Sequence, residues 1–377
     1  MQVKYFEDFT RLPESYTPLF NEAEIANFDS GRDWYANLAA TALSPDNCVL
    51  LCGVEHNEGH PVAALPLHHF KNKRALFSLS TFYSALYVPL AAQDQQDEAL
   101  TTLFKSLKSA EQDWASLRLN PIPKEQPVYE ATIRALKNAG WLPFSYYCFG
   151  NWYLSVEGRS YNEYSEALPS RIRNTIKRKS KHFYSRAGGK LEIVTGNDSV
   201  DRAIEAYNKI YLSSWKKPEP FPDFIPGMIR LFANKDQLRL GIAYTNNIPV
   251  AAQIWIVSHG RAAIYKLAYD EKFSDLSAGS ILTEHLMRHV IDVDKVHEID
   301  YLIGDDAYKK DWMNHRRERW GIMAYNPHTL AGILGSANEV ARRTVKSVLN
   351  RFGKLTSTLK NAVNNSIRHK GAKHVDP

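Results

Sequence analysis

The chain has 377 residues, of which 44% are hydrophobic, 12% aromatic and 23% charged. This length exceeds what one hydrophobic core usually holds, and the composition excludes a disordered or collagen-like chain. The three cysteines, Cys48, Cys52 and Cys148, are too few for a disulfide framework and favour a reducing, cytoplasmic compartment. Charges among residues 1–19 argue against a signal peptide, and the longest apolar run, 248–257, is about half a membrane span.

The first half of the chain predicts strands followed by helices. Short apolar runs bounded by turn residues predict four strands, and helical spacing then predicts two helices, the second ending at a glycine that suits a C-terminal cap. In chain order these are strands 48–54, 62–67, 75–79 and 85–90, helices 97–107 and 129–138, and a further strand 151–156.

The second half repeats this plan with more helices. The pattern predicts a helix over 161–187, a strand over 191–194, and helices over 200–215 and 224–231. Three consecutive strands follow at 238–244, 249–257 and 262–269, then a loop over 270–277, a helix over 278–290, a strand over 298–302, and a closing helix and strand that reach residue 324.

This order of elements predicts a mixed α/β (α+β) fold in two similar portions, each a mixed central sheet flanked by helices. We place the boundaries at residues 1–155 for the first domain and 156–330 for the second, with a tail over 331–377. The similarity of the halves is inferred from element order alone and suggests a duplicated domain.

The net charge of +6 comes from the tail. Of the 47 Lys and Arg residues, nine follow residue 338 together with only two of the 41 acids, so the preceding residues carry 38 bases and 39 acids. Apolar residues recur there at three- and four-residue steps between the basic ones, which predicts a basic amphipathic helix. Residues 342–374 could contact an anionic membrane peripherally, or the helix could pack on the body.

A second basic run lies inside the body. Residues 171–186 contain seven Lys or Arg and no acid, including the candidate substrate contacts Arg171 and Lys177. The alternative is a solvated helix face, because the charges of a helix spread round its surface.

The helix predicted over 278–290 opens with small residues. Free N–H groups in the first turn and the helix dipole favour an anion there, so Ser277, Ala278, Gly279 and Ser280 form a candidate pyrophosphate site. The alternative is a plain helix cap, because Ser and Gly serve there too.

Four segments together resemble the GNAT (Gcn5-related N-acetyltransferase) superfamily, in the branch of cellulose-biosynthesis-type acetyltransferases, whose double-GNAT architecture is similar to that of the FemAB peptidoglycan aminoacyltransferases. The segments are the basic helix 171–181, Ser213 to Lys216, the strand and loop 251–279, and Gly304 to Trp312 (GDDAYKKDW). The resemblance implies acyl transfer from acetyl-CoA or another acyl-CoA to an amine or hydroxyl, without a metal, in a cleft where two parallel strands part. The family's pyrophosphate loop usually carries an Arg or Gln with spaced glycines, whereas this loop offers only Gly279 with Ser277.

A reacting thioester needs a base, donors for the oxyanion and an acid for the leaving thiolate. Asp305 and Asp306 follow a predicted strand, and crowding of two acids raises one pKa toward that of a useful base; they could instead cap a helix. The resemblance pairs Tyr308 with Lys309, whose charge could lie beside an oxyanion or a substrate phosphate. A solvated helix lysine is the alternative.

Substrate contacts are expected from the strands and the tryptophan segment. Tyr265 and Tyr269 alternate on one strand face, Gln253 needs a partner if it is buried, and Trp215 belongs to a segment that carries the resemblance. Packing is the alternative role for the two tyrosines.

Family association implies an acceptor that is a cell-envelope glycan or related precursor. Two alternatives stay open: aminoacyl-tRNA-dependent transfer, in which the basic helix meets the tRNA, and a non-catalytic scaffold that binds nucleic acid or membrane. The salt dependence of binding distinguishes tRNA-dependent transfer from transfer from acyl-CoA, because contacts with tRNA phosphates weaken steeply with ionic strength.

Overall fold

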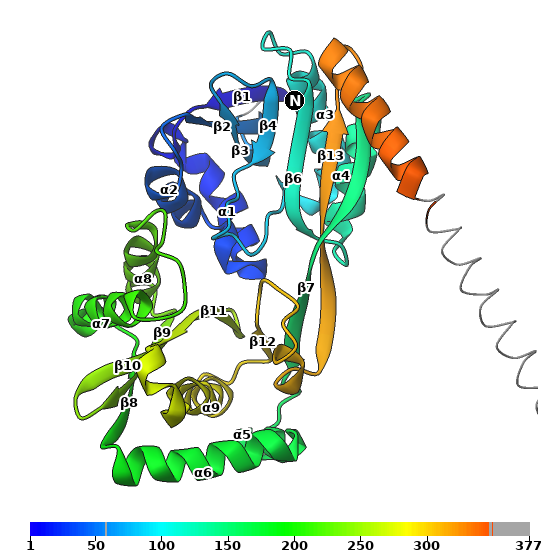
Figure 1. Ribbon diagram of the computed structural model, residues 1–377. Coiled ribbons are helices and arrows are strands. Elements are labelled where there is room, and N and C mark those ends of the chain that lie inside the picture. Colours follow the sequence, from blue (N-terminus) through cyan, green and yellow to red (C-terminus); the bar gives the residue numbers. More distant parts are fainter. Residues whose placement is uncertain (57–58, 347–348, 350–377) are drawn as a thin grey trace, which may run out of the picture.

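One mixed sheet runs through both portions of the chain in the computed structural model, which describes residues 1–56, 59–346 and 349 (Figure 1). The first portion contains β1 (Gln2–Phe6), α1 (Thr17–Ala26), α2 (Arg32–Thr41), β2 (Asn47–Glu55), β3 (Pro61–Phe70), β4 (Ala75–Ser78), β5 (Leu90–Ala91), α3 (Gln96–Lys108), β6 (Ser116–Pro123), α4 (Pro127–Asn138) and β7 (Leu142–Ser155).

The second portion contains α5 (Tyr161–Ala167), α6 (Ser170–Arg186), β8 (Gly189–Val194), α7 (Val200–Leu212), α8 (Phe224–Asn234), β9 (Leu238–Thr245), β10 (Ile248–Ser258), β11 (Arg261–Tyr269), α9 (Ala278–Asp292), β12 (Glu298–Asp300) and β13 (His315–Tyr325). The mixed α/β fold class expected from the sequence is therefore confirmed.

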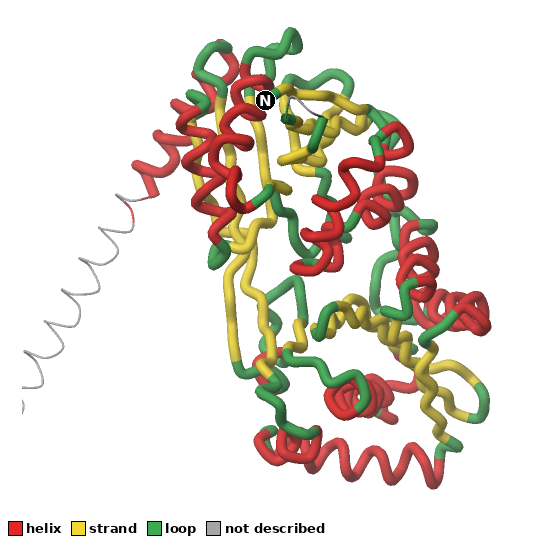
Figure 2. The backbone as a smooth tube through the Cα atoms, turned by 180° about the vertical axis from the view of Figure 1, so that it is seen from behind, coloured by secondary structure: helices red, strands yellow, loops and turns green. Residues whose placement is uncertain are grey.

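The last strand of the second portion lies inside the first. The sheet order is β1-β2-β3-β4-β6-β13-β7-β12-β11-β10-β9-β8, with β5 beside β3. β13 pairs antiparallel with both β6 and β7, and the far end of β7 pairs with β12. Figures 1 and 2 show β7 and β13 running together from one portion to the other. The domain boundary between residues 155 and 156 stays a prediction. The sheet itself extends across this boundary, because β13 of the second portion pairs with β6 and β7 of the first.

Helices cover both faces of the second portion's strands. Ile242 belongs to a core cluster formed with α2, α7 and α8, whereas the next residue, Ala243, belongs to a cluster formed with α5, α6 and α9. Alternate residues of a strand point to opposite faces, so β9 separates the two clusters. Figure 1 shows α9 between the strands and α6.

Two sequence expectations differ from the structure. Residues 85–90 were expected as a strand, but only Leu90–Ala91 is one, because the amides of Ala85 and Leu86 bond to the Asp29 carboxylate. The helix expected over 161–187 is divided into α5 and α6, since Pro169 favours an extended residue before it. The tail is helical over residues 330–346; most of the basic stretch 342–374 lies outside the described residues.

The shared sheet predicts that the first portion does not fold alone. A fragment of residues 1–155 lacks β13 and leaves the facing edges of β6 and β7 unpaired, so we expect no cooperative unfolding transition from it. Circular dichroism during urea titration measures this, with the full chain as control. A cooperative transition of the isolated fragment would contradict the expectation.

Candidate functional site

The two parallel strands at the centre of the second portion pair over only three residues. Their register joins Arg261 to Glu298, Ala262 to Ile299 and Ala263 to Asp300, and the pairing then stops. The backbone of each segment continues past this point, so the two strands separate there.

On β11 the separation begins with a β-bulge. Trp255 of β10 pairs with Ile264 and Ile254 pairs with Lys266, which leaves Tyr265 without a partner in the register. A bulge bends a strand and re-aims its side chains. The hydroxyl of Tyr265 donates to the Tyr83 carbonyl at 2.8 Å, and burial raises its pKa.

The bulge overturns the expectation that Tyr265 and Tyr269 share a strand face. Tyr265 packs against the core cluster of α2, α7 and α8, whereas Tyr269 packs against that of α6 and α9. The extra residue inverts the alternation beyond it.

On β12 the separation is set by the Asp300 carboxylate. Its Oδ1 accepts the Leu302 amide at 2.6 Å, and Leu302 has a φ of 54°, in the left-handed region. The Tyr301 amide bonds to the Trp152 carbonyl of β7. The chain after Asp300 therefore turns toward β7 and cannot extend its ladder with β11.

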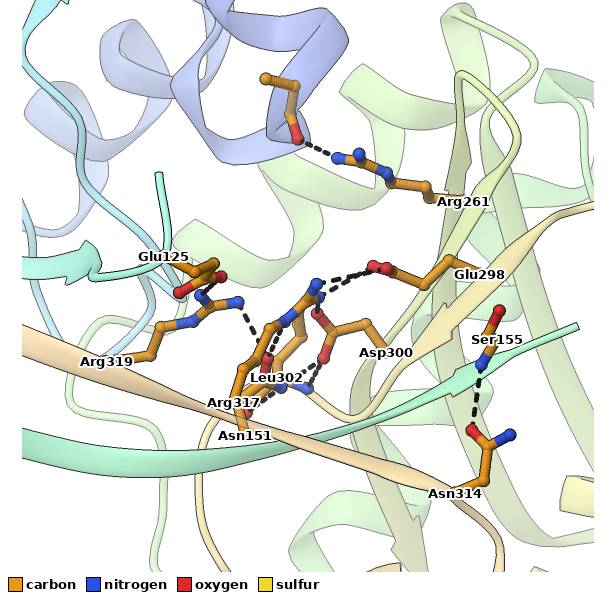
Figure 3. A network of polar contacts seen from close by, with 11 residues as sticks. Glu125, Asn151, Ser155, Arg261, Glu298, Asp300, Leu302, Asn314, Arg317 and Arg319 are labelled. Carbon is orange, nitrogen blue, oxygen red and sulfur yellow. Dashed lines mark hydrogen bonds and ion pairs between the residues drawn. The ribbon is translucent and has the colours of Figure 1, made fainter. Parts of the chain in front are cut away.

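A buried polar network holds this carboxylate, as Figure 3 shows. Asn151 of β7 donates to Asp300 Oδ1 at 2.5 Å, and Arg317 of β13 donates to Asp300 Oδ2 at 2.5 Å and to Glu298 at 2.8 Å. Arg319 donates to Asn151 Oδ1 at 2.9 Å. Because β7 and β13 supply these partners, the strands shared by both portions position the end of β12.

A cavity of about 350 Å³ lies between the diverging strands. It is lined by residues of β11, of the loop after β12, of the loop after α7 and of the first portion: Phe82, Tyr83, Ala85, Trp215, Lys216, Ile264, Tyr265, Lys266, Leu267, Tyr301, Leu302, Ile303, Asp306, Tyr308 and Lys309. Three of the four expected catalytic residues are in this set.

Lys309 has its ammonium group fixed in the cavity wall. The side chain is 5% exposed; Nζ donates to the carbonyls of Ile303 at 2.5 Å and Gly304 at 3.3 Å, and it pairs with Asp306 at 3.2 Å. Tyr308 stacks edge-on against Tyr301, and burial, with Asp306 nearby, raises its pKa to about 12. The cavity thus has a fixed cation, a carboxylate and a protonated phenol on one wall.

Asp305 does not line the cavity. Its carboxylate accepts from Trp152 Nε1 at 2.6 Å and pairs with Arg316 at 2.7 Å. The hydrogen bonds from Arg316 hold the pKa of Asp305 below its usual value, so Asp305 is not the acid of the pair whose pKa crowding would raise.

Two further lysines that line the cavity, Lys266 and Lys216, were not among the expected site residues. Lys266 pairs with Glu219, and the Tyr83 hydroxyl donates to Glu219 at 2.8 Å. Although burial opposes ionisation, these partners hold the pKa of Glu219 below its usual value. Lys216 was known only as part of a family segment; its half-buried side chain also lines the cavity.

The first turn of α9, the expected phosphate site, lies next to this cavity and does not line it. Ser277 has a φ of 55° and caps the helix through its carbonyl, which accepts from Ser280 and Ile281. A Cβ at Gly279 would meet the Tyr269 ring at 3.8 Å, an ordinary contact. Tyr269 in turn lies 4.6 Å from the cavity residue Trp215, between ring centroids. The turn is not plugged by side chains at Gly279.

Gln253 is held within the protein. It is 2% exposed, and its Nε2 donates to the Gly279 carbonyl at 2.9 Å and to Thr283 at 2.7 Å, while its Oε1 accepts from Trp255 at 2.9 Å. The expected need for a partner is met by α9, so Gln253 positions the helix start and has no free donor for a substrate.

The two candidates on the basic helix lie outside the cavity. Arg171 pairs with Asp311 at 2.5 Å at the start of α6, and Lys177 is exposed further along the helix.

Within residues 1–56, 59–346 and 349, no helix has the length and apolar character of a bilayer span, and no cluster of three acidic, His or Cys side chains could hold a metal ion.

Removing the Asp300 carboxylate should destabilise the protein. Asp300→Ala removes one of the two carboxylates that pair with Arg317 and the oxygen that accepts from Asn151 and the Leu302 amide, so we expect a loss of about 2 kcal/mol or more in the free energy of unfolding, measured by urea titration. The exposed Asp198→Ala control should change it by less than about 0.5 kcal/mol. Equal effects of the two changes would contradict the role of Asp300.

Comparisons with known proteins agree with this geometry. A family profile described as an acetyltransferase (GNAT) domain matches residues 170–310, and no curated protein sequence matches. Among solved structures the chain is similar to FemX, at 9% identity and a TM-score of 0.59 over 86% of this chain and 97% of that one. It is also similar to a conserved protein of unknown function from Bacteroides thetaiotaomicron, at 10% identity and a TM-score of 0.54 over 86% and 100%. Residues 170–310 are therefore similar to an acetyltransferase (GNAT) domain, and the fold of the chain is like that of FemX.

Proposed function

We propose that this protein transfers an acyl group, acetyl in the simplest case, from acyl-CoA to an amine or hydroxyl of a cell-envelope glycan or related precursor. One observation carries the proposal: the cavity between β11 and β12 opens where the parallel strands part and has Lys309, Asp306 and Tyr308 in its wall. The GNAT domain supports acyl transfer. The glycan acceptor rests on the family resemblance.

The donor's phosphates bind at the first turn of α9 in this proposal. The amides of Ala278 and Gly279 precede the first bond of the helix, which Ser280 donates to the Ser277 carbonyl, and the helix dipole adds favourable charge there. Trp215 and Tyr269 lie between this turn and the cavity, so the donor passes along their rings to bring its thioester between the strands.

The proposed chemistry assigns one role to each residue of the wall. Asp306 takes the proton of the attacking amine or hydroxyl as its lone pair adds to the thioester carbonyl carbon. Lys309 provides a fixed positive charge beside the oxyanion, because all three of its N–H groups are already held in place. Tyr308 donates its proton to the leaving thiolate as the carbon–sulfur bond breaks, which its raised pKa permits at neutral pH. Asp305 has only a positioning role, through Arg316 and Trp152.

Calorimetric titration with acetyl-CoA tests the donor site. The wild-type protein should bind; Gly279→Ala should bind similarly, since its Cβ fits against Tyr269, and Gly279→Trp should bind at least about tenfold more weakly because the indole covers the amides. No heat with the wild-type protein would overturn the acyl-CoA donor.

That negative result would favour the second candidate, transfer from aminoacyl-tRNA. The likeness in fold to FemX is compatible with it, and a groove along α6 is lined by Arg178, Lys179, Lys181, His182 and Ser185, together with Asp275. Binding of aminoacylated tRNA should then weaken steeply with salt.

Replacing Lys309 should abolish turnover. Lys309→Met removes the fixed charge, and we expect CoA release from acetyl-CoA with a panel of amino sugars to fall by about a hundredfold. Lys310→Met is the matched control, because Lys310 is the exposed neighbour. Equal rates in the two variants would exclude Lys309 from the chemistry.

We further propose that the chain contacts an anionic membrane surface through its C-terminal segment. Beyond residue 329 the described helix exposes Leu330, Ile333, Leu334, Val340 and Val345, and basic residues follow in the sequence. Each basic residue near such a surface contributes about 1 kcal/mol. Flotation with phosphatidylglycerol vesicles should therefore recover the full chain but not Leu330→Glu/Leu334→Glu. Equal flotation of both would contradict membrane contact.

A further inference from the structure

Three lysines line the cavity between β11 and β12, and two of them form ion pairs with carboxylates of the protein. Lys309 pairs with Asp306 at 3.2 Å, and Lys266 pairs with Glu219. Each of these lysines therefore has a carboxylate of its own.

The third, Lys216, has no carboxylate partner in the described part of the chain. Its Nζ lies 5.7 Å from the ring centroid of Trp215 and 5.8 Å from that of Tyr211. Burial lowers the pKa of Lys216 to about 8; the charges of Lys266 and Lys309 act in the same direction, and Glu219 opposes them. An ammonium group in this position lacks a counter-ion, and three donor hydrogens remain unused.

The cavity therefore has an excess of one positive charge, and removing an unpaired charge from water is unfavourable unless a partner is supplied. The proposed donor's phosphates do not supply it, because they lie at the first turn of α9, beyond Trp215 and Tyr269. The partner must be a group that enters the cavity itself.

We propose that Lys216 binds an anionic group, a carboxylate or a phosphate, of the molecule that reacts in this cavity. This inference rests on the proposed function and narrows its substrate class. The anion belongs either to the acyl group, as in a dicarboxylic acyl-CoA, or to the acceptor, as in a phosphorylated amino sugar. Lys216 then selects the substrate, while Lys309 remains beside the reacting carbonyl.

Two pairs of probes, each differing in one anionic group, distinguish these sources. Calorimetry compares succinyl-CoA with acetyl-CoA, and, on CoA-loaded protein, glucosamine 6-phosphate with glucosamine. In one pair the anionic member should bind the wild-type protein about tenfold more tightly or better, as a charge-assisted hydrogen bond provides. A preference in the first pair assigns the anion to the acyl group, and a preference in the second assigns it to the acceptor.

Variants assign the preference to Lys216. Lys216→Gln should erase it and leave acetyl-CoA affinity unchanged, and Lys216→Arg should keep it. Lys217→Gln is the matched control, since Lys217 is the exposed neighbour, and it should also keep the preference. If Lys216→Gln does not fold, labelling of the wild-type Lys216 amine by acetic anhydride, which the anionic probe should slow, replaces it.

No preference in either pair, or a preference that persists in Lys216→Gln, would overturn this inference. So would labelling of Lys216 that the anionic probes leave unchanged. These results differ from failure of the proposed function: an acetyl-CoA titration without heat removes the acyl-CoA donor, whereas normal acetyl-CoA binding without a Lys216-dependent preference removes only the anionic substrate.

Discussion

The capture of the Leu302 amide by the Asp300 carboxylate is the interaction on which the site depends. A strand that continued in register after Asp300 would pair with β11 and close the gap, leaving no cavity. The side chain instead takes the amide, and Asn151 and Arg317 hold the carboxylate in place. Buried ion pairs add little net stability compared with apolar packing, so we infer that this one serves to specify geometry. The bulge at Tyr265 produces the matching divergence on β11.

The shared strands explain why both portions are needed for one site. Asn151 and Arg317 belong to β7 and β13, which lie side by side in the sheet and reach from the first portion to the end of β12. The first portion also contributes Tyr83, whose carbonyl accepts from Tyr265 and whose hydroxyl donates to Glu219. The cavity walls are therefore built by contacts far apart in sequence, and changes in the first portion can alter the chemistry of the second.

Local patterns predicted the strands and the helix that frame the site, because β9 to β11 and α9 have strong apolar periodicity and clear turn residues. They could not decide between Asp305 and Asp306. The two residues are adjacent and identical, and only Arg316 and Trp152, from distant strands, turn one carboxylate away from the cavity. Long-range contacts likewise determine the conformation of residues 85–90, because Asp29 binds the amides of Ala85 and Leu86. They also determine the role of Lys216, because Asp306 and Glu219 pair with the two other lysines. The family segment around Tyr308 and Lys309 was the sequence signal for these two residues of the cavity wall.

The central claim, that an activated acyl donor lies between the diverging strands, is tested most directly by hydrogen–deuterium exchange with and without acetyl-CoA. We expect slower exchange at the amides of Ala278 to Ser280 and at those of Lys266 and Leu267, which flank the cavity, and unchanged exchange in α3 and α4. Slower exchange confined to the first portion, or saturating acetyl-CoA without any effect at residues 264–280, would contradict it.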